Sequence, residues 1–271
     1  MGFVVKNTTK CGLLDLLCPH SCRGCGQLGA VLCGCCKKYM FEHKSYICPI
    51  CKREFAQFLE NVAGMDKVSA EKYCSGCASN FIKIWNFDWR EGVVKKLVEE
   101  YKYGSVWAMA GVLAEMYDVA IPQEFGRQDE VTVVPLPTIG RHIRERGMDH
   151  TLILARLLAK RRGWRCQKLL ARAADTVQVG AKIDERQQQA KKAYILNDEL
   201  NSEQQYLLLD DVWTTGASMT AAADIFTKAG VKKLYGVVLA VSRPKDTAED
   251  TPKSMPEDVT SDAPSDVLKN M

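Results

Sequence analysis

One segment near the carboxyl-terminal end combines an apolar run, two adjacent carboxylates and a turn of small residues. It covers residues 207–218 and reads Leu-Leu-Leu-Asp-Asp-Val-Trp-Thr-Thr-Gly-Ala-Ser. The apolar run Tyr206–Asp210 has the length of a strand that is buried on both faces. The pattern of Ala217–Ala229 predicts a helix that Gly230 ends, and Leu234–Val241 predicts a second buried strand. Strand, helix and strand in succession predict a parallel βαβ unit, and therefore a doubly wound α/β sheet.

The same segment has the chemistry of a sugar phosphate site. Loops at the carboxyl ends of parallel strands are where open α/β sheets bind ligands, and the amides and dipole at a helix start favour phosphate. Asp210 and Asp211 suit the vicinal hydroxyls of a ribose, or a Mg²⁺ ion shared with pyrophosphate. The turn adds hydroxyl donors and, at Gly216, room for close backbone approach. We therefore predict a phosphate cradle formed by Thr214, Thr215, Gly216, Ala217 and Ser218, although an Asp pair after a strand and a Thr/Ser helix cap are each common without one.

Other segments carry the periodic patterns of regular structure. Apolar residues at helical spacing predict three helices, over Glu91–Tyr103, Val106–Val119 and Asp149–Arg162. The β-branched run Val131–Val134 predicts a strand, because Pro135 and Pro137 stop it. These elements lie upstream of the βαβ unit and complete the predicted sheet.

The cysteines are concentrated in the first part of the chain. Eleven of the twelve lie before residue 78. The chain starts without the basic stretch and apolar core of a secretion signal, and no apolar run approaches the roughly 20 residues of a membrane helix. We therefore expect a cytoplasmic protein without a membrane span. In a reducing compartment, clustered cysteines are metal ligands more often than disulfides.

Four Cys-x-x-Cys pairs occur within fewer than sixty residues. Two thiolates at that spacing can reach one tetrahedral ion from a single tight turn. The pairs predict two structural zinc sites, one built from Cys22, Cys25, Cys33 and Cys36, and one from Cys48, Cys51, Cys74 and Cys77. Interleaved ligand sets are an alternative, and Cys35 could replace Cys36. A redox role is disfavoured, because redox Cys-x-x-Cys motifs occur singly at a helix start within a βαβ unit.

Composition divides the chain into three zones. Residues 1–86 form the predicted zinc module, and residues 87–242 form the predicted sheet domain. Residues 243–271 hold four of the nine prolines, no aromatic residue, and seven acidic against four basic residues. Such a tail buries too little apolar surface to offset the entropy of ordering it, so we expect it to be disordered. The remainder is basic, which suits an anionic ligand such as a phosphate compound or nucleic acid.

The chain resembles two related groups of proteins. The string Asp210–Ser218 resembles the phosphoribosyl pyrophosphate (PRPP) motif of type I phosphoribosyltransferases, which implies their parallel α/β fold. Further segments, together with the successive Cys-x-x-Cys pairs, are similar to ComF-type competence proteins: Leu13–Pro19, Tyr101–Gly104, Val134–Pro137, Arg144–Gly147, Thr176–Gln178 and Glu185–Arg186. The ComF family usually shows Phe-Asn-Gln after the Arg-Gly, where this chain has Met148, Asp149 and His150. Whatever that segment recognises is therefore expected to differ here.

The resemblance implies roles for individual residues. Asp210 and Asp211 would hold the ribose hydroxyls at the catalytic centre, and the turn Thr214–Ser218 would cradle the 5-phosphate. In an active transferase, Mg²⁺ and basic side chains would stabilise the departing pyrophosphate. Arg144 and Arg146 are candidates for that contact, although a role as ordinary surface charge is equally compatible with the sequence.

Two functions of different class are compatible with these features. The ComF resemblance implies a protein that binds PRPP or a related ribose phosphate and handles incoming single-stranded DNA in natural transformation, with a DNA-translocation helicase as a partner for the zinc module. Residues 141–172 contain ten Lys/Arg and two acidic residues, which fits phosphate contacts to single-stranded DNA and fits a solvated helix face equally well. The alternative is an active phosphoribosyltransferase, a glycosyltransferase of nucleotide metabolism with an unknown acceptor. Binding is favoured because the sequence indicates no pocket for an acceptor.

Overall fold

The structure is a computed structural model that describes residues 20–55, 77, 79–103, 107–127, 130–173 and 193–244. The chain forms two compact units, residues 1–42 together with 254–271, and residues 43–253. The described part of the first unit contains one helix, α2 (Gly34–Glu42), and two cysteine-rich turns before it. The second unit contains the sheet. None of the described helices is long and apolar enough to cross a membrane.

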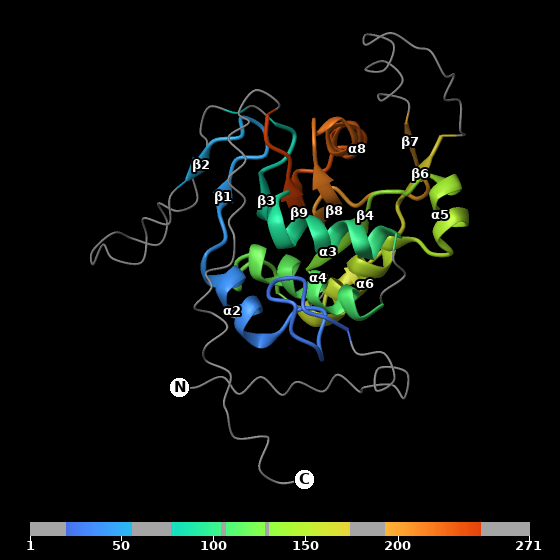
Figure 1. Ribbon diagram of the computed structural model, residues 1–271. Helices are drawn as coiled ribbons and strands as arrows, with labels where there is room; N and C mark the ends of the chain where they lie inside the picture. The colour runs from blue at the N-terminus through green and yellow to red at the C-terminus, as the bar shows by residue number, and fades with distance from the viewer. Residues whose placement is uncertain are drawn as a thin grey trace, which may run out of the picture. The chain divides into compact units, whose positions relative to one another are not determined.

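A five-stranded sheet forms the centre of the second unit (Figure 1). Every pairing in this sheet is parallel. The order across the sheet is β3-β9-β8-β4-β5. Its strands are β3 (Lys83–Trp89), β4 (Val131–Pro135), β5 (Arg165–Cys166), β8 (Gln205–Trp213) and β9 (Lys233–Val241).

Helices cover both faces of this sheet, as the predicted doubly wound α/β fold requires (Figure 1). Three helices pack together on one face: α3 (Gly92–Tyr103), α4 (Trp107–Ala120) and α6 (His150–Arg162). On the opposite face, α8 (Ala217–Lys228) packs on β8 and β9. The short helix α5 (Gly140–Arg146) follows β4 and precedes α6.

Two small antiparallel ribbons accompany the sheet. One consists of β1 (Tyr46–Ile47) and β2 (Glu54–Phe55), and it packs on β3. The other consists of β6 (Leu170–Arg172) and β7 (Tyr194–Leu196), and it packs near α8. The sequence patterns did not predict these ribbons or α5, because runs of two to seven residues carry too little periodicity.

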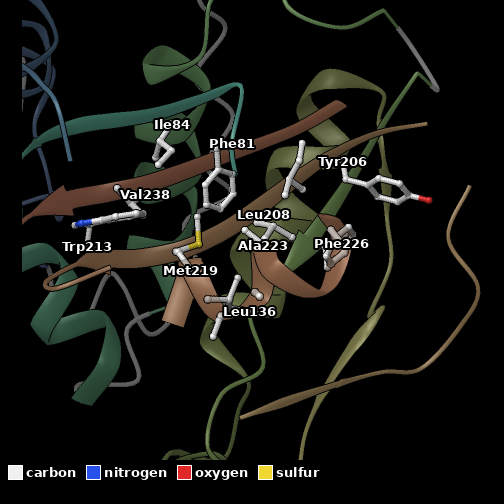
Figure 2. Close-up of a cluster of buried hydrophobic side chains, with 14 of the residues drawn as sticks. Phe81, Ile84, Leu136, Tyr206, Leu208, Trp213, Met219, Ala223, Phe226 and Val238 are labelled. Carbon is white, nitrogen blue, oxygen red and sulfur yellow. The ribbon is translucent and has the colours of Figure 1, made fainter. Parts of the chain in front are cut away.

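The core on the α8 side joins that helix to the sheet (Figure 2). Met219, Ala223 and Phe226 of α8 lie against Leu208 of β8 and Val238 of β9. The Phe226 side chain is fully buried, so truncating it to alanine is expected to cost about 3–5 kcal/mol of the free energy of unfolding. A packed α8 therefore presents its amino-terminal end at a fixed position beside β8.

The elements that the sequence predicted agree with the structure to within about one residue, with one informative exception; the sheet strands β3 and β5 and the helix α2 were not predicted. The sequence predicts a strand that ends at Asp210, whereas β8 continues to Trp213. The reason is that β9 supplies a partner over the same length, and Trp213 still pairs with Val241. On its other side, β8 loses β4 after Leu209, which is paired with Pro135. The two aspartates therefore lie where β8 has a neighbour on one side only.

The predicted division at residues 86 and 87 falls inside β3, which runs from Lys83 to Trp89. The cysteines at positions 11, 18 and 74, the segments Leu13–Pro19, Thr176–Gln178 and Glu185–Arg186, and residues 245–271 of the predicted tail lie outside the described residues.

Candidate functional site

The strand order creates a switch point between β4 and β8. The connection that leaves β4 runs through α5 and α6 to β5 on one side, whereas the connection that leaves β8 runs through α8 to β9 on the other side. Ligands of open α/β sheets bind in the crevice that opens where the connections diverge, outside the carboxyl ends of these strands. This crevice contains the Asp210–Asp211 pair.

A pocket of about 230 Å³ opens at this point. Its lining combines two carboxylates with several basic side chains and an apolar wall from the segment after β4. The lining residues that carry chemistry are Lys102, His142, Arg146, His150, Arg172, Tyr194, Asp210, Asp211 and Ser218. A volume of this size accommodates a small polar ligand better than a macromolecule.

Asp210 occupies the centre of the carboxylate pair. Desolvation and then the neighbouring charge of Asp211 raise the pKa of Asp210 to about 7. Its Oδ1 accepts a hydrogen bond from the Asp211 backbone N–H at 2.9 Å. Tyr117, fully buried on α4, donates its hydroxyl to the Asp210 carbonyl oxygen at 2.7 Å and so holds the backbone in place. Asp210 can therefore exchange a proton near neutral pH.

Asp211 forms an ion pair with Lys102 of α3, with 2.7 Å between Nζ and Oδ2. Both side chains are largely shielded, at 20% exposure each, so solvent screens this pair less than a surface pair. Lys102 lies within the segment Tyr101–Gly104, which the sequence analysis singled out for resemblance without assigning a role to the lysine. The structure brings it into the pocket.

Two arginines add positive charge to the pocket. Arg172 of β6 donates from Nε to the Pro137 carbonyl oxygen at 3.2 Å, and its guanidinium lies 5.3 Å from the centre of the Tyr194 ring. Arg146 of α5 lies 4.9 Å from the ring centre of Tyr103. Both guanidinium groups are held by an aromatic face, which leaves N–H donors available for an anion.

His150 is the most deeply buried basic group of the site, at 3% exposure. Burial and then the positive charge of Arg146 lower its pKa, so the imidazole is neutral at pH 7. Tyr101 packs edge to face against the ring, with 4.9 Å between ring centres, and donates to the His150 carbonyl oxygen at 3.3 Å. The Nδ1 atom has no hydrogen-bond partner in the structure. A buried nitrogen without a partner is costly unless a ligand or water satisfies it.

The turn between β8 and α8 depends on a glycine. Gly216 is the N-cap of α8 with φ of 79°, and no side chain caps the helix there. A Cβ at this position would lie 2.2 Å from the Trp213 ring, so only glycine fits. Ser218, at the start of α8, and Tyr194 of β7 both line the pocket. The N-cap residue offers no side chain to the first-turn amides, and the Thr215 hydroxyl accepts from the Ala217 N–H at 3.4 Å.

Only some of the predicted ligand-binding residues line the pocket. Asp210, Asp211, Ser218 and Arg146 line it. Thr214, Thr215, Gly216 and Ala217 form the turn that leads from β8 into α8 and are not among the lining residues. Arg144 is exposed and also lies outside the lining.

Four thiols of the first unit converge as the spacing predicts. The Sγ atoms of Cys22, Cys25, Cys33 and Cys36 all lie within 4.8 Å of one another, and Cys25 and Cys33 are 3.7 Å apart. A tetrahedral site with Zn–S bonds of about 2.3 Å has sulfur atoms about 3.8 Å apart, so the geometry fits. Burial alone would raise the pKa of Cys22, but hydrogen bonds from the amides of Cys33, Cys25 and Gly24 lower it to about 6. Cys36 is buried within this group, whereas Cys35 is exposed and lies outside it.

A second group of thiols lies in the sheet-containing unit. Cys48, Cys51 and Cys77 lie within 4.8 Å of one another, with 3.9 Å between the Sγ atoms of Cys48 and Cys77. These spacings again match the edge of a tetrahedral thiolate site. Both groups could hold a metal ion. Cys74, the predicted fourth ligand of the second group, lies outside the described residues.

No protein-family model matches the chain, and no curated protein matches it. Among solved structures, the chain is similar to a hypoxanthine phosphoribosyltransferase from Staphylococcus aureus, with 12% identity over 56% of this chain and a TM-score of 0.28. It spans 64% of the length of that structure. It is also similar to the hypoxanthine-guanine phosphoribosyltransferase of L. donovani, with 13% identity over 54% of this chain, 68% of that chain and a TM-score of 0.28.

Proposed function

We propose that the chain binds PRPP, or another ribose 5-phosphate compound, in the pocket between β4 and β8. The observation that carries this proposal is the combination at one switch point of a carboxylate pair, basic side chains from several elements and a helix start whose N-cap is a glycine. Each of these features alone is common. Together they complement a ligand that has vicinal hydroxyls on a ribose ring and phosphate groups at both ends.

Each part of the ligand has a matching group. Asp210 and Asp211 would accept hydrogen bonds from the ribose hydroxyls, and the turn Thr214–Ser218 would bind the 5-phosphate through its amides and hydroxyls. Arg146 and Arg172 would contact the pyrophosphate. Because adjacent carboxylates are hard oxygen ligands, the Asp pair also fits Mg²⁺, which would neutralise the charge of the pyrophosphate when bound.

The two cysteine groups fit structural zinc. A closed four-thiolate site has no open position for a substrate, so a metal there stabilises local structure. The sequence predicts two such sites within residues 1–86, with Cys74 as the fourth ligand of the second.

The resemblance to ComF proteins supports a role in DNA uptake during natural transformation. In that role a cytoplasmic protein would bind the ribose phosphate ligand as a signal or a substrate while it engages single-stranded DNA or a translocation helicase. The exposed basic side chains of α5 and α6, such as Arg141, Arg156 and Lys160, offer phosphate contacts for DNA.

An active phosphoribosyltransferase is the second candidate, and the pKa of Asp210 favours it. Such a transfer breaks the bond between ribose C1 and the pyrophosphate oxygen and forms a bond from C1 to a nucleophilic acceptor, while the pyrophosphate departs with the bonding electron pair. A carboxylate that titrates near pH 7 could take the proton that the acceptor loses. Release of pyrophosphate with an added acceptor would distinguish this function from binding alone.

Calorimetry with PRPP and Mg²⁺ tests the proposal. We expect binding by the wild type and none by the double variant Asp210→Ala/Asp211→Ala, while circular dichroism shows that the fold is retained. Equal affinity of the two proteins would refute the assignment of the site. A parallel titration with single-stranded DNA at several salt concentrations tests the DNA role, because phosphate contacts give an affinity that falls steeply with salt.

A further inference from the structure

The first turns of the two cysteine groups share one backbone design. In the first group, the Gly26 N–H donates to the Cys22 carbonyl oxygen at 2.9 Å. In the second group, the Lys52 N–H donates to the Cys48 carbonyl oxygen at 2.8 Å. Gly26 and Lys52 both follow the second cysteine of their pair, and both have positive φ, at 80° and 62°. The turn therefore needs a left-handed residue at this position.

A lysine at such a position is unusual. Left-handed backbone places the Cβ of an L-residue against its own carbonyl oxygen, so glycine is the default. Lys52 is the only non-glycine residue with positive φ among the residues that the structure describes. Because Gly26 serves the same turn in the first group, the geometry of the turn does not require a side chain. A lysine therefore occupies this position despite the strain of its left-handed backbone. This points to a function of its side chain.

The side chain of Lys52 reaches the turn before α8. Its Nζ donates to the Thr214 carbonyl oxygen at 3.0 Å. Thr214 is the first residue of the proposed phosphate cradle. The carbonyl of Thr214 and the N–H of Thr215 belong to one planar, trans peptide unit, so they point in opposite directions. A lysine that holds the carbonyl on one side thus directs the Thr215 N–H to the other side, away from the ammonium group.

We infer that Lys52 is a positioning residue for the phosphate of the ligand, carried by the second cysteine group. It fixes the orientation of the Thr214–Thr215 peptide, and it adds positive charge next to the helix start. This inference rests on the proposed function, because it assigns a role within the same binding site. It makes the second cysteine group a support for ligand binding in addition to its local structural role.

The ribbon of β1 and β2, which carries Lys52, is hydrogen-bonded to β3. The Asn86 side chain of β3 donates to the Ile47 carbonyl oxygen at 2.6 Å, and Trp89 Nε1 donates to Glu54 at 3.0 Å. The Ser45 N–H donates to Asp88 at 3.3 Å. With β1 and β2 held in this way, the base of the Lys52 side chain has little freedom, and a metal ion held by Cys48 and Cys51 would restrict it further. A tethered lysine loses less entropy when it holds the carbonyl than a free surface lysine would.

The test compares four variants of the full chain by calorimetry with PRPP and Mg²⁺. Lys52→Met keeps the length of the side chain and removes its charge and donors, so we expect about a fivefold loss of affinity. Lys52→Arg can still donate and should bind within about twofold of the wild type. Lys228→Met, which removes an exposed lysine at the other end of α8, should bind like the wild type and controls for net charge.

Lys52→Gly separates positioning from structure. Glycine relieves the left-handed backbone, so a lysine that only stabilised the turn would be replaced without harm. We expect the melting temperature of this variant to be equal to or above that of the wild type, its zinc content to be unchanged, and its PRPP affinity to fall as in Lys52→Met.

The outcomes are distinguishable. If the wild type binds PRPP and Lys52→Met or Lys52→Gly binds it equally well, the role of Lys52 is refuted and the proposed function stands. A loss of affinity in Lys228→Met as large as that in Lys52→Met would also refute it, because net charge alone would then explain the effect. If the wild type binds neither PRPP nor ribose 5-phosphate, the proposed function fails, and this inference fails with it.

Discussion

The Nζ atom of Lys102 lies 2.7 Å from Oδ2 of Asp211, and this pair joins α3 to the carboxyl end of β8. The lysine balances one charge of two adjacent carboxylates, and it also lowers the pKa of Asp210 against the larger effect of burial. Without it, Arg146 and Arg172 would be left to offset the two acidic groups when an anionic ligand binds. The ion pair therefore sets the electrostatic balance of the site.

Replacing this lysine should weaken ligand binding. In Lys102→Met, we expect PRPP affinity to fall by about tenfold or more, because a buried charge loses its partner and the pocket loses a cation. Calorimetry measures the affinity. Lys96→Met, which removes an exposed lysine of the same helix, is the matched control and should bind normally. Similar affinity for the two variants would contradict the role of Lys102.

The raised pKa of Asp210 predicts how stability depends on pH. In the unfolded chain an aspartate titrates near pH 4, whereas the folded pKa is about 7, so the native state keeps a proton that the unfolded state loses between these values. Stability should fall as pH rises through this window, and Asp210→Asn should remove that effect. We expect the difference in melting temperature, variant minus wild type, to be several degrees larger at pH 8 than at pH 4. A gain that is constant with pH, or that Asp198→Asn reproduces, would argue against this titration.

Neighbouring cysteines provide a sharp test of the first metal site. Cys36 is buried within the thiol group, whereas Cys35 is exposed and outside it. We expect elemental analysis to find two zinc ions per wild-type chain and per Cys35→Ser chain, and about one per Cys36→Ser chain. A folded wild type without zinc, or equal zinc in the two variants, would overturn the assignment.

Gly216 should tolerate no side chain. An alanine there would combine a left-handed backbone with a contact of 2.2 Å to Trp213, so we expect Gly216→Ala to cost about 1–3 kcal/mol of the free energy of unfolding and to abolish PRPP binding. Gly111→Ala is the control, because a Cβ at Gly111 meets no atom within 4 Å. This variant lies within α4 and should be equally or more stable by up to about 1 kcal/mol. Urea unfolding compares them, and a neutral Gly216→Ala would contradict the packing described for the turn.

The sequence predicted the parts of the fold that have strong local signals. The helix over Gly92–Tyr103 carries a clear period. The helix over His150–Arg162 is marked instead by its leucines and by Asp149, which caps it by accepting from the Leu152 N–H. The buried strands at β8 and β9 are continuous apolar runs. The four-thiolate group at Cys22–Cys36 follows from spacing, because two thiols two residues apart share one turn.

The composition of the pocket could not be predicted, because it depends on residues far apart in the chain. Lys102, Arg172 and Tyr194 lie on three elements that meet only in the folded chain. The extension of β8 past Asp210 depends on the length of β9, which no local pattern of β8 reveals. The sequence showed that His150 stands where the ComF family usually has another residue. Only the structure shows that this places a buried imidazole in the pocket.

The strand β3 has a consequence for anyone who shortens this protein. Its residues Lys83 to Asn86 pair with Tyr235 to Val238 of β9. A protein cut at residue 87 would uncover that length of β9 backbone, and an open strand edge recruits a strand from another copy. Such a fragment should associate or precipitate even though it retains the whole pocket. A shorter protein that begins ahead of Ser45 keeps both the strand and the hairpin that is bonded to it.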